Sequence, residues 1–178
     1  QFRPNAYGRY GALVALATDP DGAVHGIQQI YVTEDGRKAP IKVQKRTNKA
    51  HDGWSEVSAV RLPGTAPIVL TEGVETALSV WQATGHETWA CLGISNIARA
   101  PVPDGARVIV ARDGDEPNSK ADQRLRNCVT ILGGQGHDVA VAEPPAGMDF
   151  NDILQHDGEQ TIRDLIAVAQ TADAYSAE

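Results

Sequence analysis

From Pro67 to Ala142 the sequence alternates short, largely apolar runs with longer segments of helical periodicity. Apolar runs of strand length predict buried strands, and a 3.6-residue apolar period predicts helices that pack on them. The predicted strands cover 68–70, 88–92, 107–111 and 137–142, and the predicted helices cover 74–84, 94–98, 118–132 and 159–169. Strands that alternate with helices fold most readily as an open parallel sheet with helices on both faces.

The third predicted strand runs directly into two carboxylates, Asp113 and Asp115, which are followed by Glu116 and Pro117. In extended backbone, residues two apart point the same way, so the two carboxylates face the same side. Held about 4 Å apart, they repel by roughly 4 kcal/mol at an effective dielectric near 20. A bound cation or a proton on one carboxyl relieves that repulsion. A metal site and a solvated acidic loop both remain open for this stretch.

Acidic residues also follow two other predicted strands. Glu72 comes after the first strand, and Asp149 and Asp152 come after the fourth. The carboxyl ends of parallel strands share one edge of the sheet, so we expect these side chains to converge with Asp113 and Asp115. An all-oxygen cluster without histidine or cysteine favours Mg²⁺ or Mn²⁺ over zinc.

The first third of the chain has a different pattern, that of a small β-rich unit. Alternation and turn residues predict a hairpin of strands at 12–17 and 24–32, and a third short strand at 41–45. We interpret 51–54 and 62–64 as loops and expect a boundary near residue 65. The predicted fold is therefore α/β, with an open parallel four-stranded sheet and a small N-terminal β-rich subdomain. The predicted parts are 1–64 for the β-rich subdomain, 65–170 for the α/β domain that carries the acidic residues and 171–178 for a frayed tail.

Charge is unevenly distributed along the chain. The formal net charge is −7, which argues against a protein that coats nucleic acid generally. Between residues 36 and 50, however, the sequence has six cationic residues and no acidic one, and these include four of its five lysines. The six are Arg37, Lys38, Lys42, Lys45, Arg46 and Lys49. This basic segment fits a phosphate-binding face. A solvated hairpin with a basic loop is the alternative.

The remaining composition indicates an ordinary globular protein in a reducing compartment. No apolar run is long enough to cross a membrane. Cys91 and Cys128 lie in unrelated apolar patterns and are typical of reduced core residues. We expect a cytoplasmic location, with no membrane as a partner. The opening Gln1-Phe2-Arg3-Pro4 indicates a cut inside a longer protein.

Three stretches together resemble a known family. TEGVETALS, VIVARDGDEPNSKA and MDFNDIL are similar to the motifs of the Toprim domain, which bacterial-type primases, type IA and II topoisomerases and OLD-family nucleases share. The similarity is greatest to the primase-like Toprim proteins of phages, plasmids and conjugative elements, and it covers roughly residues 66–155. In those proteins an E-G-x-E-T-A-L motif follows the first strand and a D-F-N-D motif follows the last.

The resemblance implies roles for the acidic residues. Glu72 matches the Toprim glutamate, implied to be a metal ligand or general acid/base, and it is a candidate catalytic residue with Asp113 and Asp115. Those two aspartates match the metal-binding pair. Asp149 and Asp152 match positions that in primases add acidic charge near the metals.

Two positions depart from the primase pattern. Glu75 stands where many primases have an aspartate, and it has either a catalytic role or that of solvated charge in the first turn of a helix. Primases usually have a glycine shortly after D-x-D, where this chain has Pro117-Asn118-Ser119-Lys120. This leaves Lys120 as a candidate phosphate contact beside the basic segment.

The implied chemistry is metal-dependent phosphoryl transfer on nucleic acid. Its most direct form is primase-type primer synthesis, with Mg²⁺ or Mn²⁺ as cofactor and single-stranded DNA and nucleoside triphosphates as partners. The setting implied is the replication or transfer of a phage, plasmid or conjugative element, with a helicase or relaxase fused or associated. Two alternatives stay open: a Toprim nuclease or strand-nicking enzyme, and a non-catalytic module that binds metal or single-stranded DNA.

Overall fold

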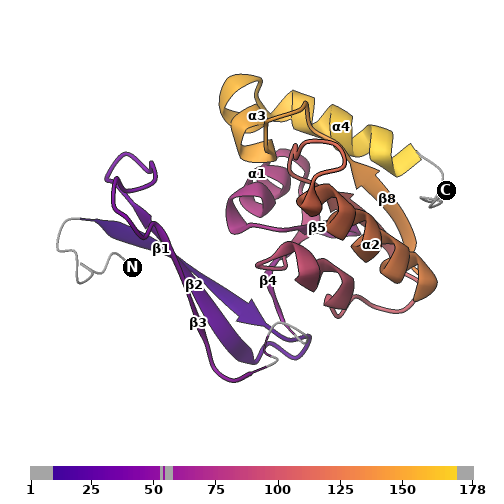
Figure 1. The fold of residues 1–178 in the computed structure, drawn as a ribbon, viewed down its shortest axis with the longest axis horizontal. Helices are drawn as coiled ribbons and strands as arrows, with labels where there is room; N and C mark the ends of the chain where they lie inside the picture. Colours follow the sequence, from indigo (N-terminus) through magenta and orange to yellow (C-terminus); the bar gives the residue numbers. More distant parts are fainter. Residues whose placement is uncertain (1–9, 53, 55–57, 172–178) are drawn as a thin grey trace.

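The computed structural model of the chain describes residues 10–52, 54 and 58–171, so the predicted tail lies outside the described residues from 172 onward. In the described part of the chain, eight strands form one sheet in the order β3-β2-β1-β4-β6-β5-β7-β8 (Figure 1). The elements are β1 Gly11–Thr18, β2 Val24–Val32, β3 Lys45–Lys49, β4 Ala59–Leu62, β5 Thr65–Thr71, α1 Val74–Thr84, β6 His86–Ala90, the 3-10 helix η2 Ile94–Arg99, β7 Arg107–Ala111, α2 Lys120–Gly134, β8 Asp138–Ala142, α3 Phe150–His156 and α4 Glu159–Thr171. Among the described residues, no helix has the length and apolar character that crossing a membrane requires.

The predicted four-stranded parallel sheet is confirmed in strands β6, β5, β7 and β8. Its central residues are almost completely buried, as the continuous apolar runs predicted. Thr71 at the end of β5 is level with Ala111 at the end of β7, and Ala111 is level with Ala142 at the end of β8. The chain therefore leaves three neighbouring strands at the same height, and this shared edge carries the predicted site.

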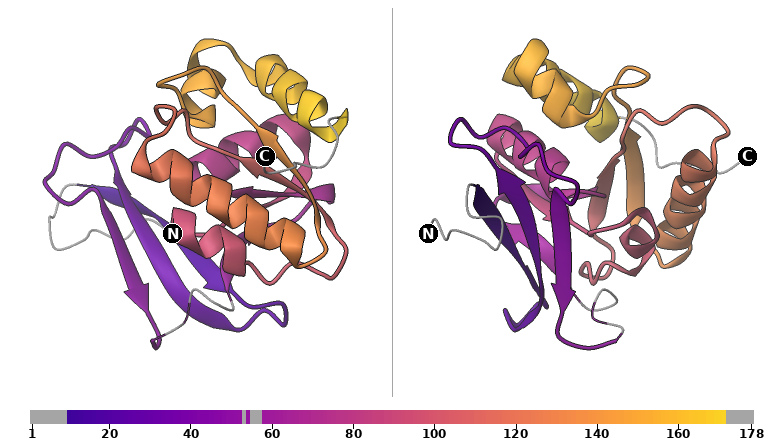
Figure 2. Two further views of the ribbon diagram at one scale, coloured as in Figure 1. Left: turned by 45° about the vertical axis from the view of Figure 1, so that its right-hand side comes forward. Right: turned by 60° about the vertical axis from the view of Figure 1, so that its left-hand side comes forward.

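Helices cover both faces of this parallel half, as the alternation of strands and helices in the sequence predicted (Figure 2). On one face α2 and η2 pack over a core that contains Trp89, Leu125 and Leu132. On the other face α1, α3 and α4 pack over a second core that contains Phe150 and Ile162. Each such buried side chain contributes about 1.5–3 kcal/mol, so the sheet edge rests on a rigid support.

Capping residues in the sequence predicted the ends of α1 correctly and those of α2 only approximately. The helix predicted at 74–84 is α1, and Gly85 ends it in the left-handed conformation with φ 69°. The helix predicted at 118–132 begins two residues later, because Ser119 caps it by accepting a hydrogen bond from the Asp122 amide at 3.1 Å. Gly133 and Gly134 lie inside that helix rather than ending it. The short helix α3 was not predicted.

The N-terminal strands extend the same sheet in antiparallel fashion. The predicted hairpin of β1 and β2 is confirmed, and β1 pairs with β4, which pairs in turn with β6. The sheet is thus continuous through the expected boundary near residue 65. Figure 1 shows these strands, in indigo and purple, reaching away from the helices.

Two expectations for this region were wrong. The third strand is Lys45–Lys49 rather than 41–45, because its register follows main-chain pairing with β2, from Gly26 opposite Lys49 to Ile30 opposite Lys45. All five of its residues are exposed, so apolar alternation could not locate this edge strand. The loop interpreted at 62–64 was wrong at its first residue, because Leu62 ends β4, a four-residue strand that was not predicted. The guanidinium of Arg61 in β4 stacks 4.0 Å from the centroid of the Trp89 ring.

Candidate functional site

Four of the predicted acidic residues come together at the shared strand edge. Burial and, after it, the nearby charges of Glu72 and Asp149 raise the pKa of Asp113 to about 6. Burial likewise raises the pKa of Glu72, with the charge of Asp115 as the next cause. Carboxylates that hinder one another's ionisation form a strong negative field, which a cation would relieve.

The loop between the two aspartates is fastened to the loop after β8. The Gly114 amide donates to the Met148 carbonyl at 2.9 Å, and the Gly147 amide donates back to the Gly114 carbonyl at 2.9 Å. A Cβ on Gly114 would lie 2.5 Å from the Met148 oxygen and 2.6 Å from that of Pro145. Only glycine permits this contact, which brings the D-G-D loop against the segment that carries Asp149.

Asp149 and Asp152 already serve a structural purpose. Asp149 accepts the Asp152 amide at 2.8 Å and Asp152 accepts the Asp149 amide at 3.1 Å, which is a reciprocal capping box at the start of α3. Asp149 still lies close enough to raise the pKa of Asp113. The metal role expected for both residues stays a prediction, and the capping explains independently why they stand three apart.

Thr76 is a site residue that sequence reasoning missed. Its hydroxyl donates to Asp113 Oδ1 at 3.2 Å, and the residue is only 3% exposed. This bond lowers the pKa of Asp113 against the larger opposing effects of burial and the neighbouring carboxylates. The available signal was its position one helical turn after Glu72, on the helix that opens from the same strand.

The basic segment reaches the site through two lysines. The ammonium groups of Lys38 and Lys45 lie 3.4 and 3.2 Å from the two carboxylate oxygens of Glu75, in the first turn of α1. Burial works against ionisation of Glu75, but its own backbone amide and the two lysines hold its pKa below the usual value. The charge of Lys45 also lowers the pKa of Glu72, against the larger effect of burial.

The other cations of the basic segment are distributed more widely. Cross-strand pairing places Lys45 and Lys49 on one face of β3 and Arg46 on the other. Arg37 pairs with Asp35, and Lys42, Arg46 and Lys49 are exposed. Lys120, the first residue of α2, is also exposed. The structure therefore brings Lys38 and Lys45, but not all of the predicted cations, to the carboxylates.

A cavity of about 720 Å³ lies beside this contact, between the N-terminal strands, α1 and α3. Lys38, Glu75 and Asp152 are among the polar side chains that line it, with Leu78 and Leu154 on its apolar side. Its volume is within the range of small-molecule sites. It gives the basic segment, α1 and α3 a shared concave surface.

The donor set fits a hard divalent cation. Carboxylate oxygens are the ligands that Mg²⁺ and Mn²⁺ prefer. Burial and neighbouring carboxylate charges raise the pKa values of both Glu72 and Asp113, and a bound cation would offset this repulsion. Within residues 10–52, 54 and 58–171, however, no three carboxylate, imidazole or thiolate groups lie close enough to form a finished ligand set. Mg²⁺ usually keeps several water ligands and binds through one or two carboxylates, so binding does not need a complete set of protein ligands.

Comparison with known proteins gives a family and a fold. The family model of the Toprim domain matches residues 67–160. The primase of Aquifex aeolicus (zinc-binding and RNA polymerase domains) is similar at TM-score 0.59 and 18% identity, over 90% of this chain and 40% of that one. The RNA polymerase domain of Mycobacterium tuberculosis primase DnaG is similar at TM-score 0.57 and 18% identity, over 93% of this chain and 59% of that one.

A third similar structure is a DnaG primase catalytic domain bound to single-stranded DNA. It has TM-score 0.61 and 15% identity, over 94% of this chain and 57% of that one. The chain thus spans between 40% and 59% of the length of these three structures. No curated protein sequence matches the chain significantly. At these identities the structural likeness establishes a shared fold.

Proposed function

The chain belongs to the Toprim family, and from this premise we propose that it is a primase-type nucleotidyltransferase that builds primers on single-stranded DNA. The observation that carries the proposal is the convergence of Glu72, Asp113 and Asp115 at one edge of the Toprim sheet. Besides burial, the charge of Asp115 raises the pKa of Glu72, and the charges of Glu72 and Asp115 contribute to the raised pKa of Asp113. The E-G-x-E-T-A-L and D-F-N-D motifs support a setting in the replication or transfer of a phage, plasmid or conjugative element.

The carboxylates would hold one or two divalent ions. Glu72, Asp113 and Asp115 are the proposed ligands, with Asp149 adding negative charge beside Asp113. When bound, such ions neutralise charge on the attacking and leaving oxygens of an in-line displacement. Because Asp113 has a pKa of about 6, it is ionised at neutral pH and available as a ligand.

The basic segment would orient the phosphates. Lys38 and Lys45 contact Glu75 in the first turn of α1, and the charge of Lys45 acts on Glu72, so a phosphate chain bound along the basic segment would be led toward the site. The similar DnaG catalytic domain that binds single-stranded DNA supports the same use here. Each lysine keeps two further ammonium protons for a phosphate, since Glu75 occupies one.

The test is a primer-extension assay with a single-stranded template, labelled nucleotides and Mg²⁺ or Mn²⁺. Elongated products would support primer synthesis, whereas shortened template would indicate a nuclease. Binding that is indifferent to EDTA and without turnover would indicate a non-catalytic module. The variant D113N/D115N should fold and lose metal-dependent activity, and D104N is a matched control, because Asp104 is exposed and precedes β7. Full activity in D113N/D115N would refute the site.

A further inference from the structure

Arg112 is the residue between the end of β7 and the first aspartate of the site, and its guanidinium turns back over the following loop. Its Nε donates to the Asp113 carbonyl at 3.3 Å, and its Nη2 donates to the Asp115 carbonyl at 3.4 Å. One rigid group thus touches the backbone at both aspartates. The side chain of Arg112 is 11% exposed, so it is largely buried where it contacts the loop.

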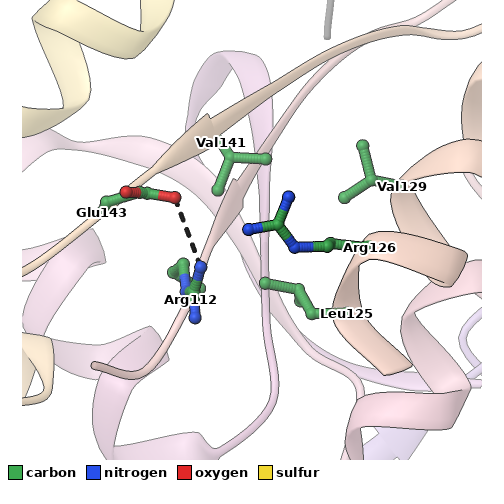
Figure 3. A pocket seen from close by; sticks show the side chains of 6 residues that line it. All are labelled: Arg112, Leu125, Arg126, Val129, Val141 and Glu143. Atoms are coloured by element: carbon green, nitrogen blue, oxygen red, sulfur yellow. Dashed lines mark hydrogen bonds and ion pairs between the residues drawn. The ribbon is translucent and has the colours of Figure 1, made fainter. Parts of the chain in front are cut away.

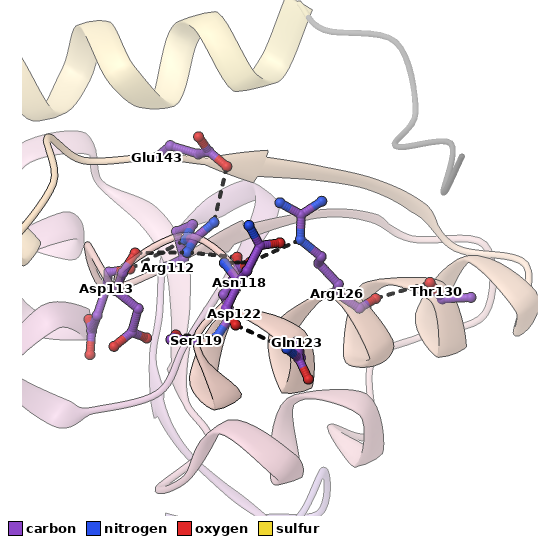
Figure 4. Close-up of polar contacts among 10 residues, drawn as sticks. Arg112, Asp113, Asn118, Ser119, Asp122, Gln123, Arg126, Thr130 and Glu143 are labelled. Carbon is purple, nitrogen blue, oxygen red and sulfur yellow. Dashed lines mark hydrogen bonds and ion pairs between the residues drawn. The ribbon is translucent and has the colours of Figure 1, made fainter.

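Two acidic side chains hold the guanidinium from outside the loop (Figure 4). Asp122 of α2 lies 3.0 Å from Nη2, and Glu143, directly after β8, lies 3.2 Å from Nη1. The planar fork of arginine can make these contacts together, whereas a lysine ammonium is a single point charge.

Asp122 is the firmer of these two anchors. It is 1% exposed, while the Glu143 side chain is 66% exposed. Asp122 pairs with Arg112 as an ion pair through Oδ1, and its Oδ2 accepts the Asn118 amide at 2.9 Å and the Arg126 Nε at 3.1 Å. A buried carboxylate with several donors is fixed in place, because leaving it unpaired would cost several kcal/mol.

We propose that Arg112, held in place by Asp122, is a positioning residue for the loop over residues 113–115. The role is to set the direction of the two aspartate side chains through the backbone that carries them. The proposal rests on the proposed function, since it takes these aspartates as the ligands of a divalent ion. Supporting groups of this kind change metal affinity by 10- to 100-fold when removed.

The surroundings of Arg112 allow the test to be made by substitution. A pocket of about 60 Å³ lies beside it, lined by Leu125, Arg126, Val129 and Val141 (Figure 3). A glutamine or lysine at position 112 therefore meets no steric obstacle on that side. Loss of function in such variants would report lost contacts rather than overpacking.

Arg107, at the start of the strand that Arg112 follows, supplies a matched control. It begins β7, pairs with Asp138, and donates through Nη2 to the carbonyls of Ala169 and Gln170 at 3.1 and 3.0 Å. R107Q therefore removes a comparable arginine network from the opposite end of β7. A purely structural role for Arg112 predicts the same behaviour in both variants.

The experiment compares wild type, R112Q, R112K, D122N and R107Q in two measurements. Hydrogen exchange of the metal-free protein measures how well the backbone of the loop is held, and calorimetric titration with Mg²⁺ measures the affinity of the site for the ion. We expect exchange of the amides over 113–116 to rise at least tenfold in R112Q, and the Mg²⁺ Kd to rise 10- to 100-fold. R107Q should leave both at the wild-type values.

Each outcome decides the question. Unchanged loop exchange in R112Q, or an equal rise in R107Q, would overturn the proposal, as would faster loop exchange with unaltered Mg²⁺ affinity. If R112Q does not fold, R112K decides, because it keeps the charge but loses the fork. If wild type itself binds no Mg²⁺, the proposed function fails, and hydrogen exchange alone still tells whether Arg112 holds the loop.

Discussion

Replacing Asp113 with asparagine should stabilise the metal-free protein at neutral pH. Burial and the charges of Glu72 and Asp149 raise the pKa of this carboxyl from 3.8 to about 6. At 1.36 kcal/mol per pH unit, that rise corresponds to roughly 3 kcal/mol. Because the side chain is only partly buried, solvent screening reduces the expected gain to about 1–2 kcal/mol. Asparagine keeps the oxygen that accepts the Thr76 hydroxyl at 3.2 Å, so the substitution removes charge without removing that bond.

The pH dependence of this effect has a defined sign. The pKa of this carboxyl is higher in the folded state, so its negative charge lowers the free energy of unfolding. Below about pH 4 the carboxyl is protonated in both the folded and the unfolded state, and this destabilisation is absent. The cost grows through the window between 3.8 and about 6 and is complete above it. D113N should therefore equal wild type near pH 4 and exceed it at pH 7.5.

Urea unfolding with EDTA at both pH values measures the difference, and D104N is the control for loss of a carboxylate elsewhere. Saturating Mg²⁺ should reverse the order at pH 7.5, because a ligand at 100 times its Kd stabilises wild type by about 2.7 kcal/mol. If D113N is less stable than wild type at pH 7.5 without metal, or if the gap is equal at both pH values, the electrostatic reasoning fails.

Three further predictions concern the surroundings of the carboxylates. G114A should cost about 1–3 kcal/mol in urea unfolding, because its Cβ would lie 2.5 Å from the Met148 oxygen; wild-type stability would refute the close approach. T76V should raise the pKa of Asp113 above its present value of about 6 and T76S should restore it, as read by carboxyl NMR titration; an unmoved pKa would exclude the hydrogen bond. K45Q should lower the log–log salt slope of single-stranded DNA binding by about 0.7, whereas an unchanged slope would place Lys45 away from the phosphates.

The parallel half of the fold could be predicted because burial on both faces leaves a strong sequence signal. Continuous apolar runs located β5 and β7, and α1 was predicted at its observed ends with Gly85 as its cap. The signal fails where a strand is exposed or short. β3 has no buried residue, and β4 has only four residues, among them the charged Arg61. Neither strand therefore shows the alternation of apolar and polar residues that a half-buried strand has.

The candidate site was predictable to the level of strand ends but not of side-chain partners. Parallel topology alone brings residues that follow β5 and β7 to one edge, which is why Glu72 and Asp113 could be paired from sequence. The partnership of Thr76 with Asp113 depends on how α1 packs. The capping role of Asp149 was visible in principle, because a second aspartate follows three residues later, but carboxylates at that spacing are also typical of a metal site.

The N-terminal strands are joined to the site by main-chain pairing, which the composition of the sequence could not predict. β4 joins them to β6 by main-chain pairing, so the basic edge is part of the same sheet that carries the carboxylates. The contacts of Glu75 with Lys38 and Lys45 then fix that edge against α1, one turn from Glu72. A flexible basic arm would attract phosphate equally well but would lose conformational entropy each time it docked. A cationic edge that is part of the sheet avoids that loss of entropy. This pre-organisation would suit the proposed primer synthesis, in which nucleotides are added repeatedly at one site.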